Sequence, residues 1–201
     1  MRAGSTGGRG FVAPRVALIG HSEGGLSVSH AAKGEPRAVA LALLATPGRP
    51  LAETMRAQVA ANPFNQPFLD AAFSALAELE AGRRVDPARA PAPLRPLFAA
   101  PAQGFLIDLM RRDPSAMLGA TRIPALIVQG GRDIQVGAAD ADRLHAARPD
   151  AERADFPAMT HVLKDCASHD RLANLATYAR ADLPLTVGLA ERIAAFVHRH
   201  A

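Results

Sequence analysis

Residues 15–33, RVALIGHSEGGLSVSHAAK, are the stretch that decides the fold. The apolar run Arg15–Gly20, closed by its glycine, predicts a short buried strand of a parallel sheet. The small and apolar residues from Gly24 to Lys33 predict a helix, which glycine and proline end at Gly34-Glu35-Pro36. Between the two, the pattern G-x-S-x-G stands in the strand–turn–helix context that it requires. Ser22, at the tip of the predicted turn, is therefore a candidate nucleophile.

Each position of this turn has a physical reason. A sharp strand-to-helix turn strains the backbone at the serine and exposes its hydroxyl. Glycines two residues to either side lack the Cβ that keeps crossing backbones apart. The helix N-terminus then lies beneath Ser22, where its dipole and free N–H groups favour negative charge. The backbone N–H of Glu23 is accordingly predicted to stabilise an oxyanion.

The rest of the chain alternates strands and helices, apart from one interruption. Arg37–Ala45 predicts a second buried strand, so strand, helix and strand form a βαβ unit and the sheet is parallel. Residues 51–119 show no strand and are predicted to form a helical insertion above one edge of the sheet. Helices are predicted there at Leu51–Ala61, Pro67–Ala81 and Gln103–Arg112, with a proline-rich break at Pro87–Pro101. After the insertion we expect a strand at Pro124–Gln129, a helix at Ala138–Ala147, a weak strand at Glu152–Phe156 and a last helix at Leu185–His198.

A serine hydroxyl needs a base, and the base needs a third group to orient it. After a turn of this kind the order along the chain is serine, acid, histidine, and sites form beyond the carboxyl ends of parallel strands. Asp133, which follows the third strand, is the predicted acid, and His161, in the loop after the weak strand, is the predicted base. The rival acids are Asp140, Asp142 and Asp155. Among the histidines His169 is the best alternative, while His30, His145, His198 and His200 lie in less suitable places.

The composition is that of one globular domain spanning residues 1–201. Hydrophobic residues make up 49% of the chain and charged residues 21%, enough for a core and unlike a disordered chain. The net charge of +4 comes from scattered arginines, so we expect no nucleic-acid partner. No apolar run is long enough for a membrane span, and Cys166, the only cysteine, allows neither an intrachain disulfide nor a thiolate metal site. We therefore expect a cytoplasmic protein without metal, with a flexible glycine-rich lead-in at residues 1–10.

Four stretches follow one another along the chain: GHSEGG at residues 20–25, LATPGRP at 44–50, IPALIVQGGRD at 123–133 and MTHVLK at 159–164. Together they resemble bacterial α/β-hydrolases of the serine aminopeptidase-like esterase group, over roughly residues 11–198. The resemblance implies a parallel-sheet α/β-hydrolase fold with a helical cap at 51–119. It implies no metal or organic cofactor and a small-molecule carboxylic ester as substrate. By the same resemblance Ser22, Asp133 and His161 are nucleophile, acid and base.

The chain departs from that group at its start. Only 15 residues precede Val16, too few for the strands that normally precede the nucleophile strand, so we expect a fold that lacks its N-terminal strands. Such a sheet has an exposed edge through which copies could pair, and it lacks the loop that supplies a second oxyanion donor. Three interpretations stay open: a carboxylesterase, a peptidase or thioesterase with the same triad, and a catalytically inactive fragment.

The insertion also carries apolar residues that either line an acyl pocket or pack the cap onto the sheet. They are Phe64, Phe68, Phe73, Leu94, Phe98, Phe105 and Met110.

Overall fold

In the computed structural model, which describes residues 15–200, the chain builds one four-stranded sheet. Its strands lie in the order β1-β2-β3-β4, and each pairs with its neighbour in parallel. All four strands therefore end at the same edge of the sheet, and the loops that follow them converge there. The strands are β1 (Val16–His21), β2 (Ala38–Leu44), β3 (Ala125–Gly130) and β4 (Glu152–Phe156). The lead-in predicted at residues 1–10 lies outside the described residues.

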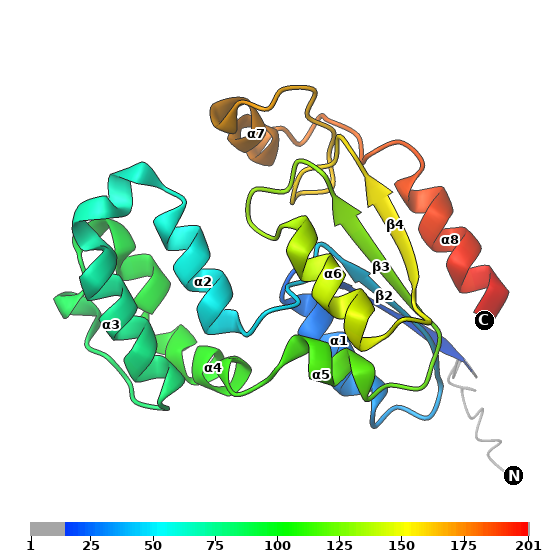
Figure 1. Cartoon of the computed structure of the whole chain (residues 1–201), viewed down its shortest axis with the longest axis horizontal. Coiled ribbons are helices and arrows are strands. Elements are labelled where there is room, and N and C mark those ends of the chain that lie inside the picture. Colours follow the sequence, from blue (N-terminus) through cyan, green and yellow to red (C-terminus); the bar gives the residue numbers. More distant parts are fainter. Residues whose placement is uncertain (1–14, 201) are drawn as a thin grey trace, which may run out of the picture.

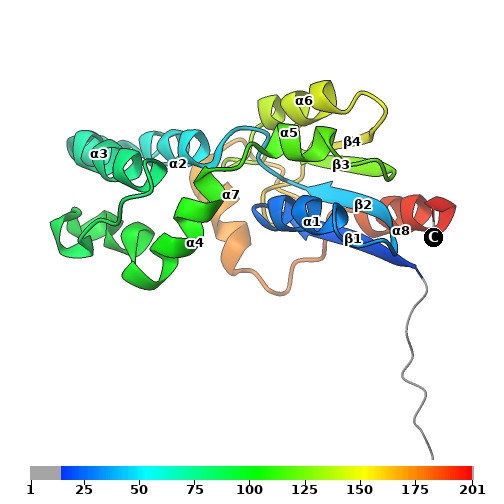
Figure 2. The ribbon, with the colours of Figure 1, turned by 90° about the horizontal axis from the view of Figure 1, so that it is seen from below.

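Helices cover both faces of this sheet (Figures 1 and 2). On one face Leu41, Leu43 and Ile127 pack against α5 and α6, with Val28 of α1 at the margin of the same cluster. On the other face the alternate strand residues pack against Phe196 of α8. Strands that are buried on both sides need apolar residues at every position, which is why β2 and β3 are predicted as continuous apolar runs. The helices are α1 (Gly24–Ala32), α5 (Pro114–Gly119), α6 (Ala138–Ala147) and α8 (Leu189–His200).

The chain between β2 and α5 forms a helical lobe beside the sheet (Figure 1). The lobe has its own core, in which Leu76, Leu79 and Phe98 are fully buried. Leu26 of α1 belongs to the same cluster, so this core is continuous with the helix that follows Ser22. The lobe contains the α-helices α2 (Leu51–Ala60), α3 (Leu69–Glu80) and α4 (Ala100–Met110), and the 3₁₀ helices η1 (Pro63–Phe68), η2 (Pro87–Arg89) and η3 (Ala92–Phe98).

Prolines account for most differences from the predicted helices of the lobe. The helix predicted from Pro67 begins at Leu69, because residues 63–68 form a 3₁₀ helix that contains two prolines. The segment 87–101, predicted as a break, is mostly short 3₁₀ helix. In contrast α4 begins at Ala100, three residues earlier than predicted, and accommodates Pro101 in its first turn, where the missing N–H has no helical partner to lose.

The C-terminal part of the chain differs more from the predicted elements than the lobe does. The helix α7 (Arg171–Ala176) and the 3₁₀ turn η4 (Thr177–Ala179) were not predicted, although the carboxylate of Asp170 accepts from the N–H of Ala173 as a helix cap does. The last helix begins at Leu189 rather than at Leu185. Thr186 is instead held by the loop after β4, since its N–H donates to the Leu163 carbonyl. Within residues 15–200, no helix has both the length and the apolarity needed to cross a bilayer.

Candidate active site

The backbone at Ser22 has the strained geometry that the turn predicts. Ser22 follows β1 directly and has a φ of 55°, in the left-handed region that side chains disfavour. Its N–H donates to the Leu44 carbonyl of β2 at 2.9 Å, which ties the turn to the neighbouring strand. The helix α1 then begins at Gly24. The chain therefore reverses from strand to helix within two residues and holds the hydroxyl at the carboxyl edge of the sheet.

The two glycines of the pattern play unequal roles. A Cβ placed on Gly20 would lie 2.5 Å from the Gly24 carbonyl oxygen, so the first glycine is required by the crossing of strand and helix. The same reason was predicted for Gly24 and is wrong there, because a Cβ on Gly24 would meet no atom within 4 Å. The second close crossing is at Gly25, where a Cβ would overlap the side chain of Thr46.

His161 lies between Ser22 and Asp133. Its Nε2 is 3.1 Å from the Ser22 hydroxyl oxygen, and its Nδ1 is 2.8 Å from Oδ2 of Asp133. A carboxylate can only accept a hydrogen bond, so Nδ1 carries the proton and Nε2 is left as an acceptor for the hydroxyl. The side chain of Asp133 is fully buried and that of His161 is nearly so. The structure therefore brings the three predicted residues into one hydrogen-bonded chain.

The Asp133 carboxylate is held from its other side by backbone. Its Oδ1 accepts from the N–H groups of Gln135 and Val136, at 2.8 and 2.9 Å. Both oxygens thus have partners, as a buried charge requires. The carboxylate is fixed in the orientation that serves His161.

The loops that carry Asp133 and His161 pack directly on each other. The N–H of Gly131 donates to the Phe156 carbonyl, and the N–H of Arg132 donates to the Met159 carbonyl. From the unpredicted helix α7, Asn174 donates its side-chain amide to the Arg132 carbonyl at 2.6 Å. The only sequence signal for this support was the cap at Asp170, which marks the start of α7.

Gln135 connects the loop that carries Asp133 to two other segments, α2 and η4. Its carbonyl accepts from the Gln58 side chain of α2, and its side-chain amide donates to the Tyr178 hydroxyl at 2.9 Å. Burial raises the pKa of Tyr178, and the negative charge of Asp133 raises that pKa further, against the opposing hydrogen bond from Gln135. The phenol is therefore neutral wherever the protein is handled near neutral pH.

The rival residues lie elsewhere. Asp140 is fully buried, but its carboxylate accepts from Arg49 and from the N–H of Gly48 and does not contact any histidine. Asp142 and Asp155 both pair with Arg153. His169 contacts Arg132, His30 contacts Arg112, His200 lies 3.7 Å from Glu152, His145 is on α6 and His198 is exposed on α8.

The predicted oxyanion donor lies at the start of α1. Glu23 is the residue just before the helix, and no hydrogen bond joins its N–H to another described residue. An N–H that lies beside the Ser22 hydroxyl and has no internal partner is free to donate to a bound group.

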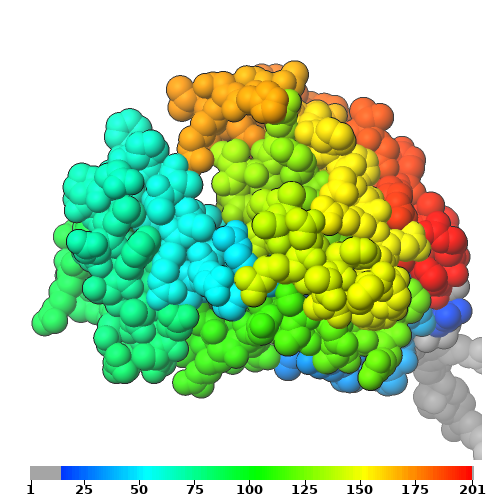
Figure 3. All heavy atoms as spheres, viewed as in Figure 1, coloured from blue at the N-terminus to red at the C-terminus, as the bar shows by residue number. Residues whose placement is uncertain are grey.

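A cavity of about 250 Å³ opens at Ser22, between the turn that carries Ser22 and the helical lobe. One part of its lining is apolar and comes from the lobe and from Pro47; another part carries the side chains of Thr54, Gln58 and Gln135. In the space-filling view a notch separates the part of the lobe around α2 from the segment that carries α7 (Figure 3). The cavity is lined by Ser22, Glu23, Pro47, Leu51, Thr54, Met55, Gln58, Leu97, Leu106 and Gln135.

The seven apolar residues considered for an acyl pocket are not among these. Phe64 is 86% exposed and Phe105 is 50% exposed. The others belong to the lobe's own core or pack against it, and that cluster includes no residue of the sheet, so they pack the lobe internally rather than onto the sheet as predicted: Phe68, Phe73, Leu94, Phe98 and Met110.

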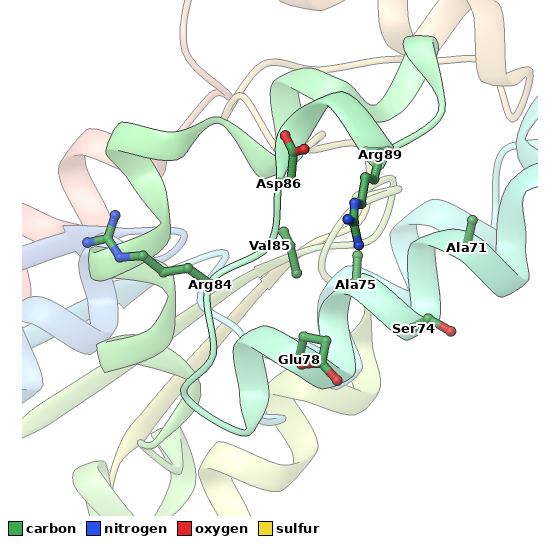
Figure 4. A pocket seen from close by; sticks show the side chains of 9 residues that line it. Ala71, Ser74, Ala75, Glu78, Arg84, Val85, Asp86 and Arg89 are labelled. Carbon is green, nitrogen blue, oxygen red and sulfur yellow. The ribbon is translucent and has the colours of Figure 1, made fainter.

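A hollow larger than the cavity at Ser22 lies in the helical lobe, away from Ser22, and measures about 360 Å³ (Figure 4). Arg84, Asp86 and Arg89 line it together with small side chains of α3. Glu78 also lines it but is paired with Arg83. The lining includes no histidine that could activate a nucleophile, so the smaller cavity is the candidate site. Among residues 15–200 no group of three or more His, Cys, Asp or Glu side chains is arranged to hold a metal ion.

Comparison with known proteins supports the fold. No protein-family model matches the chain, and neither does any curated protein. Among solved structures it is similar to a lipase-esterase related protein from Clostridium acetobutylicum, with 18% identity, a TM-score of 0.50 and coverage of 91% of this chain and 66% of that one. The protein Rv0554 from Mycobacterium tuberculosis is similar at 14% identity and a TM-score of 0.52, with coverage of 92% and 66%.

A third structure, the esterase domain of a Rhodothermus marinus protein, has 22% identity and a TM-score of 0.45 over 83% of this chain and 60% of that one. The chain thus spans between 60% and 66% of the length of these three structures. It has the α/β-hydrolase fold, with a parallel sheet flanked by helices.

Proposed function

We propose that this protein is a serine hydrolase that transfers the acyl group of a carboxylic ester to water. The observation that carries the proposal is the continuous hydrogen-bonded chain from the Ser22 hydroxyl through His161 to Asp133. A nucleophile, a base within hydrogen-bond reach and a buried group that orients the base are the parts such a reaction needs. The first of them, Ser22, lines a cavity that can admit a substrate.

In the first half-reaction the Ser22 oxygen attacks the ester carbonyl carbon while His161 Nε2 takes the hydroxyl proton. Asp133 keeps the imidazolium oriented and stabilises its charge. The tetrahedral oxyanion accepts from the Glu23 N–H. When the carbonyl reforms, the C–O bond to the alcohol breaks, and the alcohol leaves with the proton that His161 returns.

In the second half-reaction water attacks the acyl-Ser22 ester. His161 takes a proton from the water, and the tetrahedral intermediate forms a second time. The bond to the serine oxygen then breaks, the proton returns to Ser22 and the carboxylic acid departs. The apolar side chains Leu51, Met55, Leu97 and Leu106 are proposed to receive the acyl group, because they line the cavity next to Ser22.

The Glu23 N–H is the one oxyanion donor that we assign among residues 15–200. Removing one donor from such a site typically lowers turnover by about 10²–10³-fold. A reactive substrate such as p-nitrophenyl acetate is therefore the right first probe, because an ester with a good leaving group reacts with less stabilisation of the oxyanion.

The test uses a fluorophosphonate probe, which phosphonylates an activated serine with loss of fluoride, together with p-nitrophenyl acetate. We expect labelling of the wild-type chain at Ser22 and loss of both labelling and turnover in Ser22→Ala. Ser27→Ala is the matched control, because Ser27 is exposed on α1 and has no place in the mechanism. A wild-type chain that is folded but unlabelled, or a Ser22→Ala variant that labels normally, overturns the proposal.

A further inference from the structure

The backbone carbonyl of His161 has a partner that the mechanism does not use. The ring Nε2 of His21 lies 2.7 Å from this oxygen. A carbonyl oxygen only accepts hydrogen bonds, so His21 carries a proton on Nε2 and donates it. The two rings also contact each other, with centroids 4.9 Å apart and planes inclined by 45°.

The loop that carries His161 is held by its own backbone and by other segments, since Arg132 donates to the Met159 carbonyl and Thr186 to the Leu163 carbonyl. The N–H of Thr160 donates to the Lys164 carbonyl, and the N–H of Leu163 donates to the Thr160 carbonyl. Leu163 has a φ of 61°, so the loop contains a strained residue two positions after the base. These bonds fix the shape of the loop. Within the described residues, the hydrogen bond from His21 is the one that joins the His161 backbone to β1.

His21 is the last residue of β1 and directly precedes Ser22. Two consecutive residues therefore bind His161. The Ser22 hydroxyl hydrogen-bonds to the His161 imidazole, and the His21 ring donates to the His161 backbone carbonyl. The end of β1 is a rigid support for this contact. Because His161 is held both at its ring and at its carbonyl, it loses little conformational freedom when substrate binds. The 3.1 Å separation of Ser22 Oγ and His161 Nε2 depends on where the His161 backbone lies.

We propose that His21 is a positioning residue that holds His161 in hydrogen-bond reach of Ser22 through the His161 backbone carbonyl. The inference rests on the proposed function for its catalytic consequence, but not for the contact itself. His21 has an exposed side chain and does not line the cavity at Ser22, so it acts through His161 and not on substrate.

The test compares two substitutions at one position. His21→Leu removes the donor but keeps an apolar side chain against the His161 ring, and His21→Gln keeps an amide N–H in place of Nε2. A displacement of the base by about 1 Å lowers turnover by about 10²-fold. We expect His21→Leu to lower kcat and the fluorophosphonate labelling rate by about 10- to 100-fold with KM changed less than about twofold, and His21→Gln to recover most of that loss.

A second readout does not depend on catalysis. Hydrogen exchange of the peptide that covers residues 159–165 reports the anchoring of the loop, and we expect faster exchange in His21→Leu than in wild type. His198→Leu is the matched control, because His198 is exposed on α8 far along the chain from the site. Unchanged exchange in His21→Leu overturns the proposed contact. Faster exchange with unchanged labelling overturns the positioning role. A wild-type chain that never labels overturns the proposed function, and the exchange result then still decides the contact.

Discussion

Replacing Gly20 by alanine tests the geometry of the turn that carries Ser22. The added Cβ would lie 2.5 Å from the Gly24 oxygen and 2.7 Å from Gly25 Cα, whereas ordinary contact begins at 3.4 Å. Both neighbours are backbone atoms and cannot rotate away, so β1 and α1 must separate by about 0.9 Å. Overpacking of this kind costs about 1–3 kcal/mol. In a chain of this size that lowers Tm by roughly 2–12 °C.

The same movement shifts Ser22, which lies between the two elements. A displacement near 1 Å lowers the rate of a positioned reaction by about 10²-fold. We therefore expect Gly20→Ala to label with fluorophosphonate about 100-fold more slowly than wild type, measured below its Tm so that the population is folded.

Gly24→Ala provides the matched control within the same motif. The identical methyl group meets open space there, and alanine is favoured over glycine in a helix by up to about 1 kcal/mol. We expect an unchanged or slightly higher Tm and labelling within about threefold of wild type. If Gly20→Ala is as stable and reactive as wild type, or if Gly24→Ala is the more damaging change, the account of the turn is wrong.

Phe98→Ala should lower the free energy of unfolding by about 3–5 kcal/mol, because Phe98 is fully buried. Phe64→Ala, at an exposed position, should change this free energy by no more than about 0.5 kcal/mol. Denaturant unfolding measures both variants, and equal effects would contradict the core assigned to the lobe. Tyr178 is the only tyrosine, so the ultraviolet absorbance of phenolate reports it alone. Because burial raises its pKa in the folded state, its contribution to stability is complete below its unfolded pKa of about 10 and is lost as the pH rises through the folded value. Titration of the folded chain at or below the midpoint of the guanidinium-unfolded chain would contradict this.

Much of the sheet could be predicted because its pattern is local. The strand at Glu152–Phe156 has the predicted bounds, and the other three differ by one residue at each end. Each is a short apolar or β-prone run closed by a turn, which needs no distant partner to be recognised. The last helix shows the limit: its start depends on Thr186, which is held by the distant Leu163.

The pattern G-x-S-x-G and the order of Ser22, Asp133 and His161 were contained in the sequence, because a parallel sheet puts the carboxyl ends of its strands at one edge. Three matters were decided only by the tertiary structure. Gly25, and not Gly24, is the second close crossing, because this depends on where Thr46 lies. The cavity at Ser22 is lined by Met55 and Leu97 rather than by phenylalanines, because the packing of the lobe decides which side chains turn inward. His21 reaches the carbonyl of His161 across 140 residues. Periodicity along the chain reports which side of an element is buried, but not which atoms of distant loops meet, and those contacts hold the site together.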